Sequence, residues 1–353
     1  MTPEILSGIS NNQLAVTRDA IEWAYRLILG RPPECEAVVE GHRALRSIAE
    51  LRHCFITSAE FRSQRGEECL PEQFLREFPA WQGVAEADST RDFLGIRTRC
   101  SYVSDPYPGP GGTVEGYPGG HSSVHDLAEW SSLLAAVMDA REAFTLVELG
   151  AGWAPWSVAG AKAAQVRGIS TATLVMLEAD PIHVSFIHQH CRDNGIDPGD
   201  HRVLWAAVAP YDGKALFPKL ADPNAEWGAG ALFEGRKNAD GFTTTPAQEW
   251  IEVKCMSLAS VLDGLPPVDL VHCDIQGSEF EVIQAGIHEL TKRVRRLVVG
   301  THGREIEAGL FRTLGTAGWQ LEAESPCKIS QRETTWALLR DGVQVWINPR
   351  CHQ

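Results

Sequence analysis

The sequence has few positive charges, no long apolar run and no paired cysteine motif. Its 353 residues hold 32 Lys and Arg against 46 Asp and Glu, a formal net charge of −14. Proteins that bind the phosphates of nucleic acids carry basic stripes, so this charge argues against a nucleic-acid partner. No apolar stretch approaches about 18 residues, the length that a membrane-spanning helix needs. We therefore expect no membrane span.

The nine cysteines are odd in number and scattered, and no two of them form a C-x-x-C pair. This pattern favours reduced thiols and a cytoplasmic location over a disulfide framework. Residues 1–10 also lack the basic start and apolar block of a signal peptide. What the chain does have is 44% hydrophobic residues, enough for a sizeable core in one or two domains.

The first 70 residues predict a helical module. Apolar residues recur at helix spacing over 21–29, the pattern stops at Gly30-Arg31-Pro32-Pro33, and a second apolar face runs over 45–55. Thr57-Ser58-Ala59-Glu60 then has the pattern of a capping box. No residue here points to chemistry, so we expect a helical cap that aids docking or dimerisation.

Residues 67–120 predict irregular structure. Gly, Pro and three tyrosines gather in Ser101–His121, a composition that fits a lid and a linker about equally well. We therefore divide the chain into a helical module over 1–70, a linker or lid over 71–120, and a domain over 121–353 that carries the chemistry.

From Thr145 onward, strand and helix patterns alternate. The expected strands are 145–150, 172–179, 202–208, 268–275, 294–301, 319–324 and 334–340. The expected helices include 157–167, 181–194, 278–290 and 304–317. Such alternation predicts a mainly parallel sheet, with ligands beyond the carboxyl ends of its central strands. Residues 210–250 break the pattern, and we expect them to form an insertion over the same edge.

The run from Thr145 to Trp153 is the most informative one. A buried strand reaches Glu148, and two glycines, Gly150 and Gly152, follow one residue apart. Glycines let the backbone approach a ligand closely, and the acid before them suits a positively charged cofactor tail. A dinucleotide site needs a further glycine where Pro155 stands. The pattern favours a methyltransferase that uses S-adenosylmethionine, with Trp153 beside the cofactor; a nicotinamide-dependent oxidoreductase is the alternative.

The next two strands supply further candidates for the cofactor site. Glu178 ends the second strand, where an acid can bind both ribose hydroxyls of a nucleoside. Ala179 follows it, and Asp180 before Pro181 is better placed as a helix cap. The third strand ends near Ala207, which would pack on an adenine face or simply in the core.

Polar residues end two later strands. Asp274 closes one buried strand, and His302 closes the strand that we expect beside it. His302 suits a general base that removes a proton from the acceptor. Asp274, which we expect beside the two glycines, would contact the cofactor and orient that acceptor. A divalent metal held by Asp274 and His302 is the rival account. For Glu279, favourable placement at a helix N-terminus is the preferred interpretation.

His125 and Glu129 are four residues apart on a predicted helix, so they share one face. They would reach the cofactor or close over the acceptor, which makes His125 a third catalytic candidate. A solvated helix face is the alternative.

Together, Glu148-Leu149-Gly150-Ala151-Gly152, Glu178 and Asp274-Ile275-Gln276-Gly277-Ser278-Glu279 resemble the FkbM family of S-adenosylmethionine-dependent methyltransferases, over about residues 121–325. The resemblance implies a Rossmann-like class I methyltransferase fold: α/β, a mainly parallel seven-stranded sheet flanked by helices, here with a small N-terminal all-α domain. The family has Glu where Gln276 stands, which puts in doubt any role that needs a charge there.

Members of that family mostly methylate hydroxyl oxygens of sugars, polyketides and related metabolites. Residues 25–33 with 58–61 resemble a helical module attached to bacterial surface and polysaccharide-related proteins. The two resemblances imply an O-methyltransferase for a sugar or polysaccharide hydroxyl, with a homodimer or a partner enzyme contacted through the module. A non-catalytic glycan-binding or scaffold protein is a further alternative.

Overall fold

The computed structural model describes residues 15–56, 58, 61, 70–104, 111–118, 127–233, 249–332 and 335–351. The chain divides into two compact units. One comprises Met1–Cys69 with Pro118–Ser123, and the other comprises Leu70–Tyr117 with Val124–Gln353.

The described elements of the first unit are helical, as the sequence predicts. They are α1 (Arg18–Ala24), the π-helical turn η2 (Tyr25–Leu29), α2 (Glu36–Arg43) and α3 (Ile48–Ile56). Apolar side chains spaced along these helices form a small core: Ile21, Tyr25, Leu29, Val39, Leu51 and Phe55. Gly30 ends η2 with φ 71°, which confirms the predicted stop. Ser58 accepts a hydrogen bond from the amide of Phe61; the rest of the predicted capping box lies outside the described residues.

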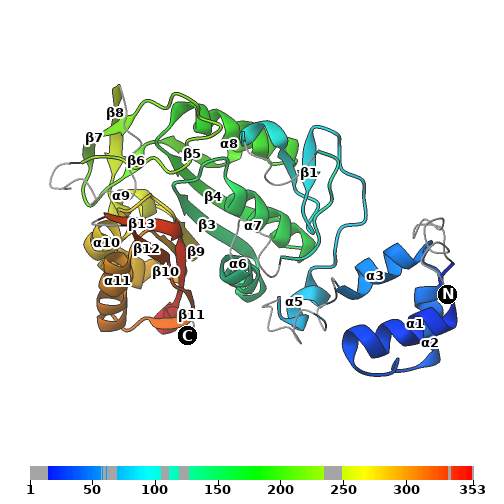
Figure 1. The fold of residues 1–353 in the computed structure, drawn as a ribbon. Coiled ribbons are helices and arrows are strands. Elements are labelled where there is room, and N and C mark those ends of the chain that lie inside the picture. Colours follow the sequence, from blue (N-terminus) through cyan, green and yellow to red (C-terminus); the bar gives the residue numbers. More distant parts are fainter. Residues whose placement is uncertain are drawn as a thin grey trace. The chain divides into compact units, whose positions relative to one another are not determined.

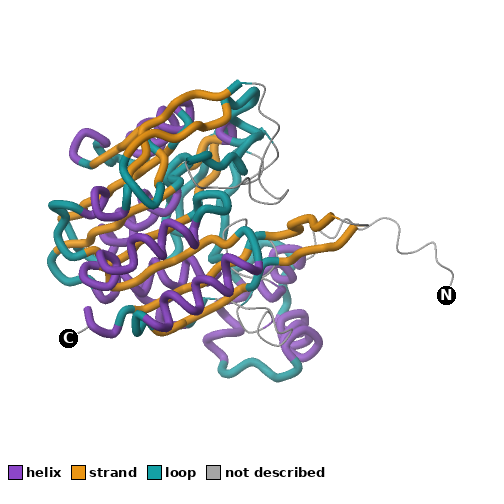
Figure 2. The backbone as a smooth tube through the Cα atoms, turned by 90° about the vertical axis from the view of Figure 1, so that its left-hand side faces the viewer, coloured by secondary structure: helices purple, strands orange, loops and turns teal. Residues whose placement is uncertain are grey.

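The second unit is built on a seven-stranded sheet in the order β11-β14-β10-β9-β3-β4-β5 (Figures 1 and 2). Its strands are β3 (Ala143–Leu149), β4 (Thr171–Glu178), β5 (Arg202–Trp205), β9 (Val268–Cys273), β10 (Val294–Thr301), β11 (Gln320–Ser325) and β14 (Gly342–Ile347). Neighbouring strands from β5 to β10 pair in parallel, and β14 runs antiparallel to both of its neighbours. The predicted mainly parallel sheet is therefore confirmed.

Helices cover both faces of this sheet (Figure 1). Residues of α6 (Leu127–Asp139), α7 (Pro155–Val166) and α8 (Pro181–Asp193) share a core with one face. Residues of α9 (Leu258–Leu262), α10 (Glu279–Arg293) and α11 (Arg304–Thr316) share a core with the other. The strand order reverses between β3 and β9, and in open α/β sheets ligands bind outside the carboxyl ends of the strands at such a point.

Two predicted strands need correction: one breaks in two, and the other forms but pairs outside the large sheet. The predicted strand 202–208 breaks at Ala206: β5 stays in the large sheet, whereas β6 (Ala207–Val208) joins β7 (Gly213–Pro218) and β8 (Trp250–Met256) in a separate sheet. The predicted strand 334–340 is not the seventh strand of the large sheet. Its counterpart β13 (Thr335–Arg340) pairs with β12 (Lys328–Arg332), and β14 takes the place between β10 and β11. The two segments have the same length, six residues each. The side chains of Val343, Val345 and Trp346 in β14 are buried, as expected for a strand inside the large sheet.

Residues 70–104 are more ordered than predicted. They form α5 (Glu72–Glu77), the hairpin β1 (Ser89–Arg91) and β2 (Arg97–Arg99), and the 3₁₀ turn η3 (Cys100–Tyr102). Phe74, Phe78 and Phe93 enter the same core as α6 and α7, and sparse aromatics of this kind give no periodic signal. The segment is therefore part of the packed unit.

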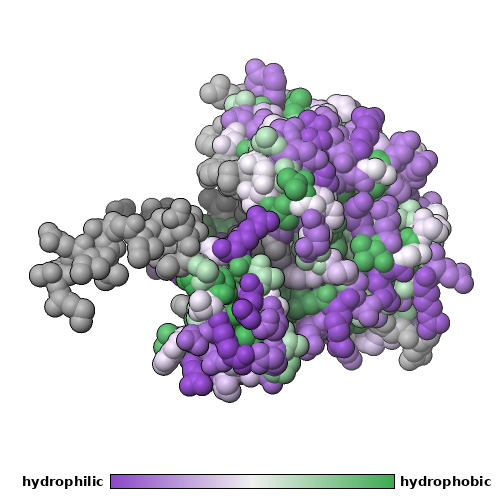
Figure 3. Space-filling view, turned by 90° about the vertical axis from the view of Figure 1, so that its right-hand side faces the viewer, coloured by the Kyte–Doolittle hydropathy of each residue, from purple (hydrophilic) through white to green (hydrophobic). Residues whose placement is uncertain are grey.

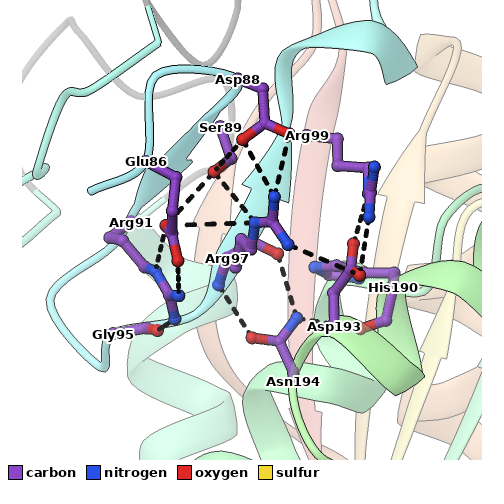
Figure 4. Close-up of polar contacts among 10 residues, drawn as sticks. All are labelled: Glu86, Asp88, Ser89, Arg91, Gly95, Arg97, Arg99, His190, Asp193 and Asn194. Atoms are coloured by element: carbon purple, nitrogen blue, oxygen red, sulfur yellow. Dashed lines mark hydrogen bonds and ion pairs between the residues drawn. The ribbon is translucent and has the colours of Figure 1, made fainter.

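An ion-pair network fastens the hairpin to the end of α8 (Figure 4). Arg99 donates to both carboxylate oxygens of Asp193, at 2.5 and 2.9 Å. Arg97 pairs with Asp88, and its backbone amide donates to the side chain of Asn194 at 2.8 Å. Asp193 is the last residue of α8 and Asn194 follows it, so these contacts hold β2 against the end of α8.

The surface drawn in Figure 3 is mostly polar, with apolar side chains in small groups. Among the described residues, no helix has both the length and the apolar character needed to cross a membrane. The eight cysteines in the described part of the chain are free thiols, as predicted.

Candidate functional site

The glycine turn, Gly150-Ala151-Gly152, follows β3 and lies between the ends of β4 and β9. Gly150 and Gly152 have φ angles of 75° and 56°, a region that side chains with a Cβ rarely adopt. A Cβ on Gly150 would also lie 1.9 Å from the carbonyl oxygen of Asp274. The amides of Gly150 and Ala151 donate to the carbonyl of Leu177 in β4, at 3.0 and 2.8 Å. The sequence predicts close approach to a ligand here; the structure adds close approach to a neighbouring strand end.

Glu148 directs its carboxylate at the start of α7. Its two oxygens accept hydrogen bonds from the amides of Trp156 and Ser157, at 3.1 and 2.8 Å. The side chain is buried, and burial raises its pKa to about 7. Pro155 is the first residue of α7, so the helix begins two residues before the predicted start at 157. Glu148 thus stabilises the helix terminus, and its contact with a cofactor stays a prediction.

Glu178 ends β4 directly beside the turn. It accepts hydrogen bonds from the amides of Gly152 and Asp180, each at 2.8 Å, and its burial raises its pKa. Asp180 caps α8 by accepting from the amides of Ile182 and His183, so the predicted cap is confirmed. The ribose role of Glu178 stays a prediction.

An aromatic wall from the insertion covers the second glycine. A Cβ on Gly152 would lie 3.4 Å from ring carbon Cζ3 of Trp227. The Trp227 ring stacks on His183 with centroids 4.0 Å apart and planes 7° apart, and meets Trp153 edge-on at 4.7 Å. Its Nε1 donates to the carbonyl of Asn224 at 3.0 Å. The predicted insertion over this edge is confirmed here.

The sequence interpretation missed Trp227 and His183, because their proximity depends on the insertion folding back onto α8. Ala179 and Ala207 both pack into the small apolar cluster of β7 and β8. Their contact with an adenine ring stays a prediction.

Asp274 and His302 do meet at the ends of β9 and β10, as predicted. His302 Nε2 lies 3.4 Å from Asp274 Oδ1, and His302 Nδ1 lies 2.9 Å from Glu279 Oε1. The side chain of His302 is 2% exposed and that of Asp274 is 38% exposed. Asp274 is therefore the member of the pair that faces solvent.

Glu279 is wholly buried and also accepts from the amides of Gly277 and Ile275, at 2.9 and 3.2 Å. The preferred interpretation of Glu279 as a helix-terminus charge misses its contact with His302. That contact joins residues 23 positions apart in the sequence, so no local pattern reveals it.

The charges of this cluster act on one another strongly. Burial by itself lowers the pKa of His302, but the carboxylates of Glu279 and Asp274 outweigh it and raise that pKa to about 10. Burial raises the pKa of Glu279, and the imidazole outweighs it to give a net lowering. Loss of solvation by the surrounding protein raises the pKa of Asp274 to about 6, although the charge of His302 by itself would lower that pKa.

Gln276 occupies the position at which the sequence departs from the FkbM pattern. Its φ is 56°, unusual for a residue with a side chain, and its Nε2 donates to Asp274 Oδ1 at 3.0 Å. A Cβ on Gly228 would lie 3.8 Å from the Gln276 amide oxygen. The insertion that carries Trp227 thus reaches from the glycine turn to the turn after β9.

Glu129 is buried, which rules out the solvated helix face given as the alternative; its contact with the cofactor or the acceptor stays a prediction. Its Oε1 lies 2.8 Å from Nε2 of His272 in β9, and the His272 ring lies against Trp156 with centroids 5.2 Å apart. His125 and His121 lie outside the described residues. The catalytic role predicted for His125 stays a prediction.

Comparison with known proteins finds a relative in sequence. No protein-family model matches the chain. A protein described as a "Putative methyltransferase" from Jannaschia sp. (strain CCS1) is 30% identical over 278 residues, which span 78% of this chain and 98% of the relative.

Solved structures resemble the chain only loosely. The methyltransferase FkbM from Methylobacillus flagellatus KT is 12% identical, with a TM-score of 0.36 over 58% of this chain and 44% of that one. The precorrin-6y C5,15-methyltransferase from Geobacter metallireducens GS-15 is also 12% identical, with a TM-score of 0.35 over 62% and 87%. Scores this low add nothing about function.

The sheet order, the switch point between β3 and β9 and the glycine turn agree with the Rossmann-like methyltransferase fold that the sequence predicts. On its identity to the Jannaschia protein over nearly that whole relative, the chain belongs to the same family of methyltransferases.

Proposed function

We propose that the chain is an S-adenosylmethionine-dependent O-methyltransferase of the FkbM type that acts on a hydroxyl of a sugar or polysaccharide. The observation that carries this proposal is the contact between Gly150 and the backbone of Asp274. It puts the turn suited to the donor beside the strand end that bears Asp274 and His302. A donor methyl and an acceptor hydroxyl would then meet at one edge of the sheet.

The donor end of the proposed site is the glycine turn with Glu178 and Trp227. Glu178 already accepts a hydrogen bond from the amide of Gly152, so a ribose bound to it would lie against the turn. The indole of Trp227 lies over Gly152 and supplies an aromatic wall. A cation such as a sulfonium is attracted to the face of a tryptophan ring.

The acceptor end is the pair of Asp274 and His302. Asp274 would contact the acceptor, because its side chain is the more exposed of the two. The acceptor oxygen attacks the methyl carbon in line with the carbon–sulfur bond. The carbon–oxygen bond forms as the carbon–sulfur bond breaks, and the sulfur leaves as a neutral thioether with the electron pair. The hydroxyl proton passes to the carboxylate of Asp274, because His302, with its pKa raised to about 10, already carries its proton at neutral pH. Alignment of the two reactants contributes up to about 7–11 kcal/mol.

Calorimetry with S-adenosylhomocysteine tests the donor end, and methyl transfer from isotope-labelled S-adenosylmethionine to a panel of sugars tests the acceptor end. We expect saturable binding and an O-methyl ether as product. Asp274→Asn should lower the rate of transfer roughly 10²- to 10⁴-fold and leave the Kd of S-adenosylhomocysteine nearly unchanged.

Failure to bind S-adenosylhomocysteine would favour the non-catalytic glycan-binding alternative. Saturable binding of a nicotinamide cofactor instead would favour the oxidoreductase. Methyl transfer to nitrogen or carbon acceptors in preference to hydroxyls would contradict the O-methylation part of the proposal.

A further inference from the structure

Among the described residues, Nε2 of His302 has no hydrogen-bond partner, although it is buried. It lies 3.4 Å from Asp274 Oδ1 and 4.0 Å from Asp341 Oδ1, and neither contact has the geometry of a hydrogen bond. A buried polar atom left unpaired costs about 1–3 kcal/mol. His302 Nε2 thus faces two carboxylate oxygens without bonding to either. Possible ligand atoms of Asp274, Glu279 and His302 all lie within 4.8 Å of one another, and Asp341 lies beside this group, 4.0 Å from His302 Nε2.

The register of the sheet explains why His302 lies beside Asp274 and Asp341. Cys273 in β9 pairs with Val299 in β10, so Asp274 and His302 leave the same edge on neighbouring strands. Thr301 in β10 pairs with Gly342 in β14, so His302 and Asp341, one residue beyond that pair, lie opposite each other. The three side chains come from three adjacent strand ends, which are rigid supports for a binding site.

The other imidazole nitrogen is already fixed. Nδ1 of His302 lies 2.9 Å from Glu279 Oε1, and Glu279 is itself held by the amides of Gly277 and Ile275. The Glu279 carboxylate accepts a hydrogen bond from Nδ1–H and so keeps that proton on Nδ1. A cation that displaces the Nε2 proton would then bind the lone pair of Nε2. Histidines that bind metals have just this kind of partner behind them.

We propose that His302 Nε2, Asp274 and Asp341 bind one divalent first-row cation, with Glu279 as the outer carboxylate that orients the imidazole. Two atoms that share a cation at about 2.1 Å each lie no further apart than about 4.2 Å, and both distances from His302 Nε2 are shorter. The side chain of Asp341 is 61% exposed, so it would turn toward Asp274 to complete the site. One imidazole with two carboxylates suits Mn²⁺ or Zn²⁺.

This inference rests on the proposed function in one respect only, the use of the cation. A cation beside Asp274 would bind the acceptor hydroxyl and lower its pKa. The pair would then hold the cation, and the hydroxyl proton would pass to the Asp274 oxygen that does not bind the cation and from there to solvent. Binding of the cation itself requires neither donor nor acceptor.

A substitution of Gln276 should strengthen cation binding and so tests the proposal by a gain in affinity. Its amide donates to Asp274 Oδ1, so Gln276→Glu replaces a donor by a second carboxylate beside the site. Without a cation the two acids repel each other. With a cation the added charge strengthens binding, as the number of charged ligands does at other cation sites.

The experiment measures Mn²⁺ binding to the full chain, with neither the methyl donor nor the acceptor present. Binding is followed by calorimetry and by the loss of the electron paramagnetic resonance signal of free Mn²⁺. We expect one site. Asp341→Asn and His302→Gln should each weaken it at least about tenfold, and Gln276→Glu should strengthen it about tenfold. Asp263→Asn is the matched control, because this exposed acid precedes β9 at the opposite end from Asp274.

Thermal unfolding shows whether each variant folds; Asp341, 61% exposed, is the substitution least disturbing to the core. The proposal is overturned if neither Mn²⁺ nor Zn²⁺ binds saturably, or if the Asp341 and His302 variants bind as the unmodified chain does. Full methyl transfer after exhaustive chelation would also overturn the cation's role while leaving the proposed function intact. Failure to bind S-adenosylhomocysteine would reject the proposed function without touching the Mn²⁺ result.

Discussion

Gly150 faces the carbonyl oxygen of Asp274 so closely that a Cβ on the glycine would lie 1.9 Å from it. This contact joins the two halves of the sheet at the point where the strand order reverses. It also fixes the distance between the glycine turn and the Asp274–His302 pair. Both halves of the proposed reaction therefore depend on a residue that has no side chain.

Gly150→Ala should destabilise the fold by roughly 3–5 kcal/mol, because it adds a backbone clash to a positive φ. Gly168→Ala is the matched control: its φ is 77°, but a Cβ there meets open space. It should cost about 1–2 kcal/mol from backbone strain alone. Denaturant unfolding of both variants measures the difference, and equal costs would contradict the close approach.

The buried carboxyl of Glu148 should make stability fall as the pH rises. Burial raises its pKa in the folded chain from 4.5 to about 7, so the folded state binds a proton that the unfolded state has lost. The stabilisation is fully present below pH 4.5 and is lost as the pH rises through about 7. The change is about 3 kcal/mol.

Glu148→Gln keeps an oxygen to accept from the start of α7 but cannot ionise. The free energy of unfolding of the two proteins, measured from pH 4.5 to 8, should diverge in favour of the variant as the pH rises. A constant difference across that range would show that Glu148 ionises normally in the folded chain.

Trp227 should form part of the donor pocket. Trp227→Ala removes the ring over Gly152 and should raise the Kd of S-adenosylhomocysteine about tenfold, as the loss of a buried aromatic contact does. Trp250→Ala, which removes a partly exposed ring from β8, should leave the Kd unchanged. Tighter binding by the Trp227 variant would mean that the indole fills the pocket instead of lining it.

The pair of Arg99 and Asp193 should contribute measurably to stability, because the side chain of Asp193 is only 10% exposed and two hydrogen bonds join the pair. Asp193→Asn should cost about 1–2 kcal/mol. Asp200→Asn, at an exposed position in the turn before β5, should cost less than about 0.5 kcal/mol. Thermal or denaturant unfolding compares them, and equal costs would show that the network in Figure 4 adds little.

Local patterns were enough for the features whose partners lie within a few residues. Asp180 caps the helix that begins at Pro181 as predicted, because a helix start is fixed by its own first turn. The alternation of strands and helices likewise predicts the sheet and its ligand edge, so Asp274 and His302 could be placed together before their distance was known.

The sequence by itself determined the helical first unit, the parallel sheet and the two glycines, since each follows from spacing and backbone preference. Only the tertiary structure decided that Glu279 supports His302, that Asp341 lies opposite it, that Trp227 covers Gly152 and that β14 enters the sheet. The physical reason is that these contacts depend on strand register and on packing between segments far apart in the chain, which no local periodicity encodes.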